Sequence, residues 1–550
     1  MRVSLAASRL RLSILIASVA ALVIAALLIV VGLTANGGNG RAPGLAATPT
    51  ATAIETPSPE PTPTDYPTLP PRPPVTHPDT VIPEGFEEWY LQEVVWVPCD
   101  AVSGGPRFEC ATISAPLSWR DADAGSIELA VNRRSATGSR QGSVLINPGG
   151  PGSSGIEYLM SAANTFGERL RDAFDIVGFD PRGVGQSTPI RCFDDAEKDA
   201  AISRDFSTDD AGLAEMAASS QAWGEACYAA SGALLGNVDT QSAARDMDLI
   251  RALLGEERLD FLGFSYGTQL GATYAMLFPQ HVGRFVLDGA VDVTLTSEES
   301  SLNQAQGFEQ ALRSYVIDCQ GGANCPLTGT VEEGMEQVRE LLETAFTDPF
   351  PTSSGRRVTE TLAFYGIAVT LYSEDSWMFL TMALQEAILM GTADTLLLLA
   401  DFYFDRNEDG TFSSNMIEAF LAVRCLDDRA NDDLAVMRQW AARIEEAAPT
   451  MGAFFGFGGL SCSGWPFDPV PPLTWGPVDT EQPIVVIGTT GDPATPYESA
   501  HALVATLGNA VMVTFDGEGH TAYGRSNDCI LNAVDSFFVD GIAPANGLVC

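Results

Sequence analysis

One nine-residue stretch constrains the fold of this chain more than any other. Residues 259–267 read Leu-Asp-Phe-Leu-Gly-Phe-Ser-Tyr-Gly, so a short apolar run leads into a Gly-x-Ser-x-Gly motif, and the next residues have the pattern of a helix. A strand, a sharp turn and a helix in this order form a nucleophile elbow, which holds one side chain clear of a sheet edge. Gly263 and Gly267 fit this device because the two backbones pass too closely for a Cβ atom. The stretch therefore predicts Ser265 as a nucleophile.

Apolar runs of strand length recur along the chain and alternate with helical patterns. The runs are Ile127–Asn132, Ser143–Asn147, Phe174–Phe179, Leu259–Gly263, Arg284–Leu287, Ile484–Ile487 and Val511–Phe515. This alternation predicts an α/β protein with a mostly parallel sheet covered by helices on both faces. Functional sites in such sheets lie at the carboxyl ends of the strands.

The chain begins with a candidate membrane segment. Residues 1–34 hold a basic stub and an uncharged apolar run from Leu12 to Leu33, which is long enough to span a bilayer. We expect a retained transmembrane signal anchor with its arginines in the cytoplasm, which places the rest of the chain outside the cytoplasm. Cleavage after Ala35, which would release a secreted protein, is the alternative.

Composition divides the remaining residues into four segments. Residues 35–84 are rich in Pro and Thr and predict a disordered linker. Residues 85–290 and 479–550 carry the strand runs and form the two predicted parts of one sheet domain. Residues 291–478 carry amphipathic helical patterns and few strand runs, which predicts an inserted helical cap.

Charge and cysteine content narrow the class of protein. The formal net charge of −41 argues against nucleic acid as a partner, because nucleic-acid binding needs a basic face. An even number of cysteines, ten, in an exported chain favours disulfides over metal sites. Their order favours neighbouring pairs: Cys99–Cys110, Cys192–Cys227, Cys319–Cys325, Cys425–Cys462 and Cys529–Cys550.

A serine nucleophile needs a base, and the chain has only four histidines. His77 lies in the linker, His281 precedes a strand at the opposite edge of the sheet, and His501 lies in a helical pattern. His520 follows the last long strand on a Gly-rich loop at the carboxyl edge, so we expect His520 to be the base.

The acid that orients this base is predicted to be Asp492, which ends the preceding strand. The chain order Ser265, Asp492, His520 is that of the α/β-hydrolase triad. Asp288, which follows another strand, is the main rival. Backbone N–H groups must also stabilise the tetrahedral oxyanion. We expect these donors in the Gly-rich loop, at Gly149 and Gly150, and at Tyr266, directly after the nucleophile.

Several motifs together resemble the secreted tripeptidyl aminopeptidases, a bacterial α/β-hydrolase family related to the proline iminopeptidases. The matching motifs are Asn147–Gly155, Phe179–Ser187, Gly263–Thr268, Val286–Asp292, Gly488–Tyr497, Cys462–Pro466 and the C-terminal Gly541–Cys550. The resemblance covers residues 95–550. It implies a serine exopeptidase with Ser265, Asp492 and His520 as the triad, and an oxyanion hole that includes Gly149 or Gly150. The iminopeptidases have a histidine where this chain has Pro148. The role of that histidine therefore does not carry over to this chain.

The resemblance implies peptide substrates with a free amino terminus. Three functions remain open: an aminopeptidase, a hydrolase of other esters or amides with the same triad, and a catalytically idle binding protein. Carboxylates should bind the substrate's amino group, and the sequence does not choose among its candidates, which include Glu157, Glu298, Glu299, Asp375 and Asp427.

Two further motifs are interpreted as structural. Asp180 and Arg182 predict a salt-bridge and turn pair. Residues 405–410 imitate the start of a calcium loop, but Met416 occupies the position that needs a bidentate Glu, which favours a surface turn. We expect no metal and no cofactor.

Overall fold

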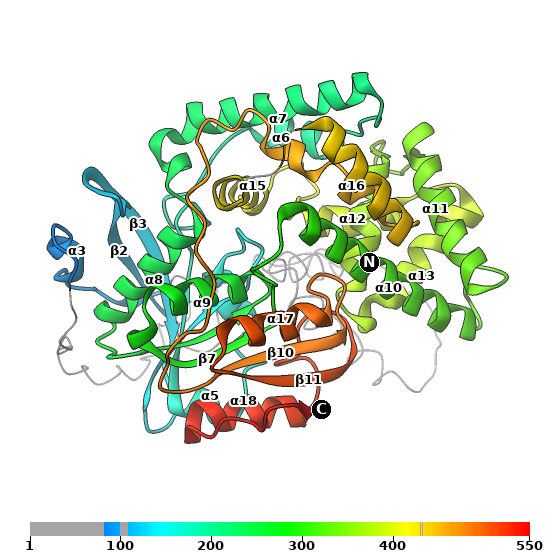
Figure 1. Cartoon of the computed structure of the whole chain (residues 1–550). Helices are drawn as coiled ribbons and strands as arrows, with labels where there is room; N and C mark the ends of the chain where they lie inside the picture. The colour runs from blue at the N-terminus through cyan, green and yellow to red at the C-terminus, as the bar shows by residue number, and fades with distance from the viewer. Residues whose placement is uncertain (1–81, 100–107, 429–430, 432) are drawn as a thin grey trace, which may run out of the picture.

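A ten-stranded sheet runs through the part of the chain that the computed structural model describes, which is residues 82–99, 108–428, 431 and 433–550. The strand order is β1-β2-β3-β5-β4-β6-β7-β10-β11-β12, and the longer strands are visible in Figure 1. The strands are β1 (Val97–Pro98), β2 (Phe108–Ser118), β3 (Asp121–Arg134), β4 (Gly142–Asn147), β5 (Phe174–Phe179), β6 (Leu259–Phe264), β7 (Val282–Asp288), β10 (Ile484–Gly491), β11 (Ala510–Glu518) and β12 (Leu548–Val549).

Pairing in this sheet is mostly parallel, as the alternation of strands and helices predicts. The strands from β5 through β4 to β12 pair in parallel, whereas β1, β2, β3 and β5 pair antiparallel. Every residue of β4 and β5 is buried, because helices cover both faces of the sheet. Each of the predicted apolar runs lies within a strand or overlaps one. Strand β2 was not predicted, because its Cys, Thr, Ser and Pro residues break any continuous apolar run.

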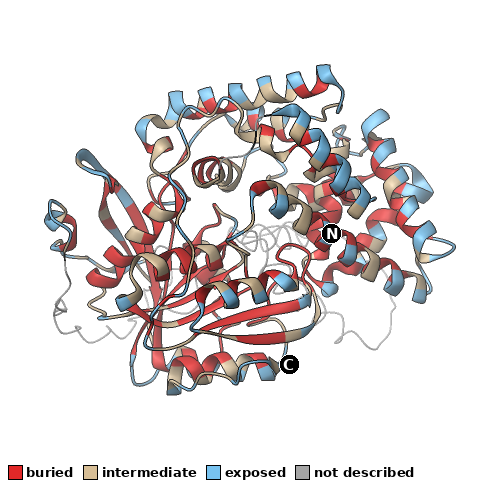
Figure 2. Cartoon of the chain, viewed as in Figure 1, coloured by how far each residue is buried: buried red, intermediate tan, exposed pale blue. Residues whose placement is uncertain are grey.

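Helices from both parts of the sheet domain form the two outer layers (Figure 1). One face packs against α8 (Thr240–Leu253), α9 (Tyr266–Leu277) and α17 (Tyr497–Leu507). The other face packs against α4 (Gly155–Ala162), α5 (Glu168–Ala173) and α18 (Asp528–Asp540). The sheet between them is the most continuously buried region of the molecule (Figure 2). These layers establish an α/β-hydrolase fold.

A helical assembly lies over the carboxyl ends of the strands, between β7 and β10 in sequence. Its helices are α10 (Ser297–Gly321), α11 (Val331–Thr347), α12 (Glu360–Leu371), α13 (Trp377–Gln385), α14 (Asp394–Tyr403), α15 (Met416–Asp427) and α16 (Leu434–Ala447), with a short hairpin of β8 (Phe350–Pro351) and β9 (Arg357–Val358). We call this assembly the cap. The exact domain boundaries stay predictions.

Two helices that precede β6 also attach to the cap. They are α6 (Asp195–Ile202) and α7 (Asp210–Ser231). On α6, Asp199 accepts charged hydrogen bonds from Arg406 Nε at 2.7 Å and from Arg356 Nη2 at 3.1 Å, and both arginines belong to the cap. The residues that contact the cap therefore begin well before residue 291.

The predicted membrane anchor and most of the predicted linker lie outside the described residues. Within residues 82–550, apart from the gaps given above, no helix combines the length and the apolar character that crossing a bilayer requires.

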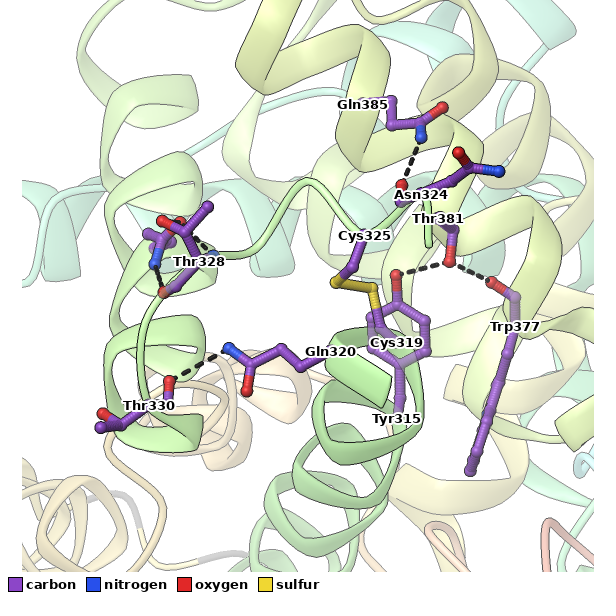
Figure 3. Close-up of a disulfide and its surroundings, with 11 residues drawn as sticks. Tyr315, Cys319, Gln320, Asn324, Cys325, Thr328, Thr330, Trp377, Thr381 and Gln385 are labelled. Carbon is purple, nitrogen blue, oxygen red and sulfur yellow. Dashed lines mark hydrogen bonds between the residues drawn. A yellow bond between two sulfur atoms is a disulfide. The ribbon is translucent and has the colours of Figure 1, made fainter. Parts of the chain in front are cut away.

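Five disulfides confirm the predicted sequential pairing. Figure 3 shows the shortest loop, closed by Cys319–Cys325 at the end of α10. Beside this loop, Tyr315 of α10 and Thr381 of α13 are joined by a hydrogen bond of 3.0 Å between their hydroxyl oxygens. The Cys425–Cys462 bridge closes a longer loop and ties α15 to the short helix η6 (Gly458–Cys462).

Loop length predicts which of these two bridges stabilises the fold more. In the chain-entropy model the loop of 37 residues closed by Cys425–Cys462 corresponds to about 4 kcal/mol, and the loop of 6 residues closed by Cys319–Cys325 to about 2 kcal/mol. Cys425→Ser with Cys462→Ser should therefore lower the unfolding free energy more than Cys319→Ser with Cys325→Ser. Denaturant titration of the two double variants measures the difference, and equal losses would contradict this account.

Candidate active site

Ser265 occupies a strained turn at the end of β6. Its backbone φ of +56° and ψ of −126° are unusual for a residue with a side chain. The turn is held because the Ser265 amide donates to the carbonyl of Asp288 at 2.9 Å, while its own carbonyl accepts from the Thr268 amide at 2.8 Å. Helix α9 begins at the next residue, Tyr266. The predicted elbow is therefore present, with Ser265 at its tip.

Glycines let three backbone segments meet at this elbow. A Cβ atom on Gly263 would lie 2.4 Å from the Gly267 carbonyl oxygen, and one on Gly267 would lie 2.7 Å from the Asn147 carbonyl oxygen. A Cβ atom on Gly149, which has a φ of +101°, would lie 2.8 Å from Ser265 Cβ. No other residue type fits at these three positions without moving the strand, the helix or the Gly-rich loop.

His520 and Asp492 form the hydrogen bond that a catalytic base and its orienting acid require. His520 Nδ1 lies 2.9 Å from both carboxylate oxygens of Asp492. The His520 ring is buried, and its Nε2 has no hydrogen-bond partner among the described residues. This leaves one ring nitrogen free to accept a proton.

A dense set of donors fixes the Asp492 carboxylate. It accepts from the Ala494 amide at 2.9 Å, the Thr495 amide at 2.8 Å and the Thr495 hydroxyl at 3.0 Å. The Thr521 amide adds a fourth donor at 3.2 Å. Thr495 was not among the residues predicted from the sequence. A signal existed, because an Asp followed three residues later by Thr is a pattern typical of hydrogen-bonded turns.

The end of β7 links the nucleophile to the base. The carbonyl of Asp288 accepts from the Ser265 amide, as described above, and the next residue, Gly289, lies against the imidazole. A Cβ atom on Gly289 would be 3.2 Å from His520 Cε1. One peptide unit thus contacts both the elbow and the His520 ring, which brings the three predicted triad residues to one sheet edge.

The side chain of Asp288, the rival acid, binds backbone instead of the imidazole. Its carboxylate accepts from the Ala522 amide at 3.0 Å and from the Tyr523 amide at 2.7 Å. Burial raises the pKa of Asp288 to about 6, although the two amide donors oppose this shift. Asp288 therefore anchors the loop that carries His520, and Asp492 is the residue that contacts its ring.

The Gly-rich loop lies where one of the two expected oxyanion donors is needed, against Ser265. The Gly149 amide donates to Asn147 Oδ1 at 3.0 Å, so it is not directed at a substrate. This leaves Gly150 as the candidate donor of the loop. Tyr266 opens α9, where an amide has no intrahelical acceptor, and its nitrogen would lie 3.1 Å from a Cβ atom on Gly149. The amides of Gly150 and Tyr266 are therefore the best-placed pair.

The cap covers the base. The His520 amide donates to the carbonyl of Tyr372 at 2.9 Å, and the Tyr372 ring meets the imidazole edge-on with centroids 5.3 Å apart. Burial raises the pKa of Tyr372 above its usual value, with the Asp492 charge acting in the same direction. Tyr372 directly follows α12. No sequence signal pointed to this residue, because the contact joins segments that are far apart in the chain.

The other described histidines and the Asp180 and Arg182 pair lie outside the triad and make structural contacts. His281 Nδ1 lies 2.8 Å from Asp248 Oδ1, and His501 is exposed and packs on Tyr497. The predicted pair of Asp180 and Arg182 is structural, but a salt bridge between the two is wrong. Arg182 instead binds Asp246 of α8 through Nη2 at 2.6 Å.

Most of the candidate carboxylates for an amino group have other contacts. Glu299 accepts from the Thr296 amide at the start of α10, and Glu298 accepts from the Asn431 amide. Asp427 accepts from the Thr240 amide at 2.8 Å, and Asp375 is exposed. Glu157 alone among the five is half-buried with no hydrogen bond or ion pair from its carboxylate to any described residue.

The fold and this site define a serine hydrolase of the α/β-hydrolase class. Residues 448–550 match the family model described as TAP-like protein. The serine protease Hip1 of Mycobacterium tuberculosis is 35% identical over 480 residues, which cover 84% of this chain and 91% of that protein. Carboxylesterase B of Mycobacterium tuberculosis is 38% identical over 455 residues, covering 80% and 86%. A tripeptidyl aminopeptidase of Streptomyces lividans is 30% identical over 466 residues, covering 83% and 86%.

The chain belongs to the tripeptidyl aminopeptidase family of α/β-hydrolases, and it is a serine hydrolase. This confirms the resemblance that the motifs indicated.

Substitution of the two acids separates their roles. Asp492→Asn removes the partner of His520 and should lower turnover by about 10⁴-fold, as in other triads. Asp288→Asn replaces one carboxylate oxygen with an NH2 group, which cannot accept from the buried amides of Ala522 and Tyr523. It should lower the unfolding free energy by about 1–3 kcal/mol, with a smaller loss of turnover. Steady-state kinetics and denaturant titration measure both. A larger kinetic loss for Asp288→Asn than for Asp492→Asn would reverse the assignment.

Proposed function

We propose that this protein is an extracytoplasmic serine aminopeptidase that releases short peptides, in particular tripeptides, from the free amino termini of peptide substrates. The proposal rests above all on the His520–Asp492 hydrogen bond, with Nε2 left free at the sheet edge that carries Ser265. Family membership supports the choice of peptides, because one relative is named as a tripeptidyl aminopeptidase and another as a serine protease.

In the proposed mechanism Ser265 Oγ attacks the scissile carbonyl while His520 Nε2 takes the hydroxyl proton. Asp492 holds the imidazole in position and stabilises the imidazolium that forms. The amides of Gly150 and Tyr266 donate to the oxyanion. His520 then gives the proton to the leaving amine, and an acyl-enzyme on Ser265 remains. Water, activated by the same base, hydrolyses this ester and restores the serine.

Disulfides support the proposed location outside the cytoplasm. Five bridges lie within the described residues, and bridges of this kind persist mainly in oxidising compartments. The apolar run of residues 12–33 would then anchor the protein in the membrane, or would be removed to release a secreted protein. The binding partners are peptides, and no nucleic acid is expected.

A second candidate function is the hydrolysis of carboxylic esters. One observation favours it: a relative with 38% identity is named Carboxylesterase B. The same triad and the same oxyanion donors would perform this reaction, since an acyl-enzyme forms from an ester as it does from an amide.

Substrate kinetics distinguish the two candidates. A tripeptide 4-nitroanilide with a free amino group should be cleaved with a much higher kcat/KM than its N-acetyl form, because an exopeptidase binds the ammonium group. Comparison with a short-chain 4-nitrophenyl ester gives the esterase activity. Equal rates for the free and acetylated peptides would contradict the aminopeptidase proposal.

Ser265→Ala should abolish turnover of both peptides and esters without loss of the fold, since only the backbone N–H and C=O of Ser265 form hydrogen bonds to other described residues. Circular dichroism and thermal unfolding of the variant serve as the control. Peptide cleavage by Ser265→Ala at the wild-type rate would show that another residue is the nucleophile and would exclude the triad assigned above. Peptide binding without any turnover by the wild-type protein would instead support the idle binding protein.

A further inference from the structure

A cavity of about 270 Å³ lies beside the Gly-rich loop, outside the triad. Its wall includes Gly152, Ser153 and Ser154 of that loop, Glu157 of α4, Lys198 of α6, and the segment from Phe412 to Glu418 that leads into α15. The cavity therefore lies where the sheet domain, α6 and the cap meet.

The cavity adjoins the oxyanion loop closely. The amide of Ser153, a lining residue, donates to the carbonyl of Gly149 at 3.3 Å. Gly149 in turn packs against Ser265, as described above. Helix α4 starts directly after Ser154, whose hydroxyl accepts from the Glu157 amide at 3.1 Å. The Gly-rich loop is therefore in contact with Ser265 on one side and with the cavity on the other.

Carboxylates outnumber cations on the cavity wall. The charged lining residues are Glu157, Asp195, Asp405, Glu418, Arg191 and Lys198. Lys198 is the only lysine of the chain. It is buried, lies 2.5 Å from Glu418 Oε1, and stacks on the Phe412 ring at 4.6 Å. Lys198 therefore neutralises Glu418, whereas the buried Asp405 and the half-buried Glu157 have no ion pair with any described residue.

Asp405 is the most unusual of these residues. The sequence favoured a surface turn for residues 405–410. This holds for the exposed Glu408 and Asp409 but is wrong for Asp405, which is only 4% exposed. Its Oδ2 accepts from the Ser414 hydroxyl at 2.6 Å, while its Oδ1 has no partner among the described residues. A buried carboxylate oxygen without a donor is costly, so Asp405 Oδ1 is suited to accept from a donor or to pair with a cation.

We infer that this cavity is the subsite for the protonated amino terminus of the peptide substrate, with Asp405 and Glu157 as the carboxylates that bind the ammonium group. This inference rests on the proposed aminopeptidase function and names the residues that give it its specificity. Glu157 faces the cavity from the sheet domain and Asp405 from the cap, so an ammonium group would bridge the two parts of the protein.

The electrostatics of the cavity agree with this assignment. Burial raises the pKa of Glu157 to about 7, and the neighbouring Asp180 charge adds to the rise. Burial likewise raises the pKa of Asp405 to about 7, with Glu157 adding to the rise, while the Ser414 hydroxyl and Lys198 lower it. A bound ammonium would stabilise both ionised forms. Among the described residues no group of three or more acidic, His or Cys side chains could hold a metal ion instead.

The kinetic test uses Asp405→Asn and Glu157→Gln in the full chain. Each variant should raise KM for a free-amine tripeptide 4-nitroanilide by about ten- to hundredfold, the loss expected for one charged hydrogen bond. Turnover of a short-chain 4-nitrophenyl ester, which lacks the ammonium group, should stay at the wild-type value. Asp409→Asn is the matched control, because it makes the same charge change at an exposed position of the same loop.

Binding measurements make the test independent of catalysis. Calorimetric titration of Ser265→Ala with a free tripeptide should show binding that N-acetylation of the tripeptide or addition of Asp405→Asn abolishes. Binding should be weaker at about pH 5.5 than at about pH 7.5, because both carboxyls lose their charge below their raised pKa values while the amine stays protonated.

The outcomes separate this inference from the proposed function. Unchanged affinity in Ser265→Ala with Asp405→Asn would overturn the inference, even if the wild-type protein prefers free amino termini. An equal fall in ester turnover and peptide turnover would also overturn it, since that result indicates a structural role. Amine-dependent binding in a protein that does not distinguish free from acetylated peptides in turnover would retain the subsite and contradict the aminopeptidase function.

Discussion

Two buried carboxylates hold the loop that follows β11, and the chemistry of the site depends on this arrangement. Asp492 contacts the imidazole of His520 and the Thr521 amide, while Asp288 binds the next two amides along the chain. Because the Asp288 carbonyl also binds the Ser265 amide, the carboxyl ends of β6, β7, β10 and β11 are locked to one another. The nucleophile and the base therefore keep their relative positions without any direct covalent link.

The cap adds residues to the site that the sheet edge does not supply. Tyr372 covers His520, so the base is buried where electrostatic interactions are stronger than in water. Beside the Gly-rich loop, Asp405 of the cap and Glu157 of the sheet domain line the same cavity. If the cavity binds the substrate's amino terminus as we infer, chemistry at the sheet edge and recognition at the boundary with the cap are separate, which would let members of one family keep the triad while they differ in substrate.

Local sequence signals made the triad predictable. The features that could not be predicted depend on packing between segments that are far apart in the chain. The elbow around Ser265, the strand end at Asp492 and the Gly-rich loop before His520 are each readable within a few residues. The choice between Asp492 and Asp288 needed the structure, because both follow strands and only the fold shows which carboxylate faces the ring. Arg182 binds Asp246, 64 residues away, and the burial of Asp405 depends on packing between the cap and the sheet domain. No local pattern carries that information.

The central claim is that Ser265, His520 and the amides of Gly150 and Tyr266 act on one reacting carbonyl. A crystal structure of the protein after reaction with a peptidyl phosphonate tests it most directly. The account predicts a phosphorus bonded to Ser265 Oγ, with one phosphonate oxygen about 2.7–3.1 Å from both amide nitrogens. An adduct on another residue, or a phosphonate oxygen that points away from these two amides, would contradict it.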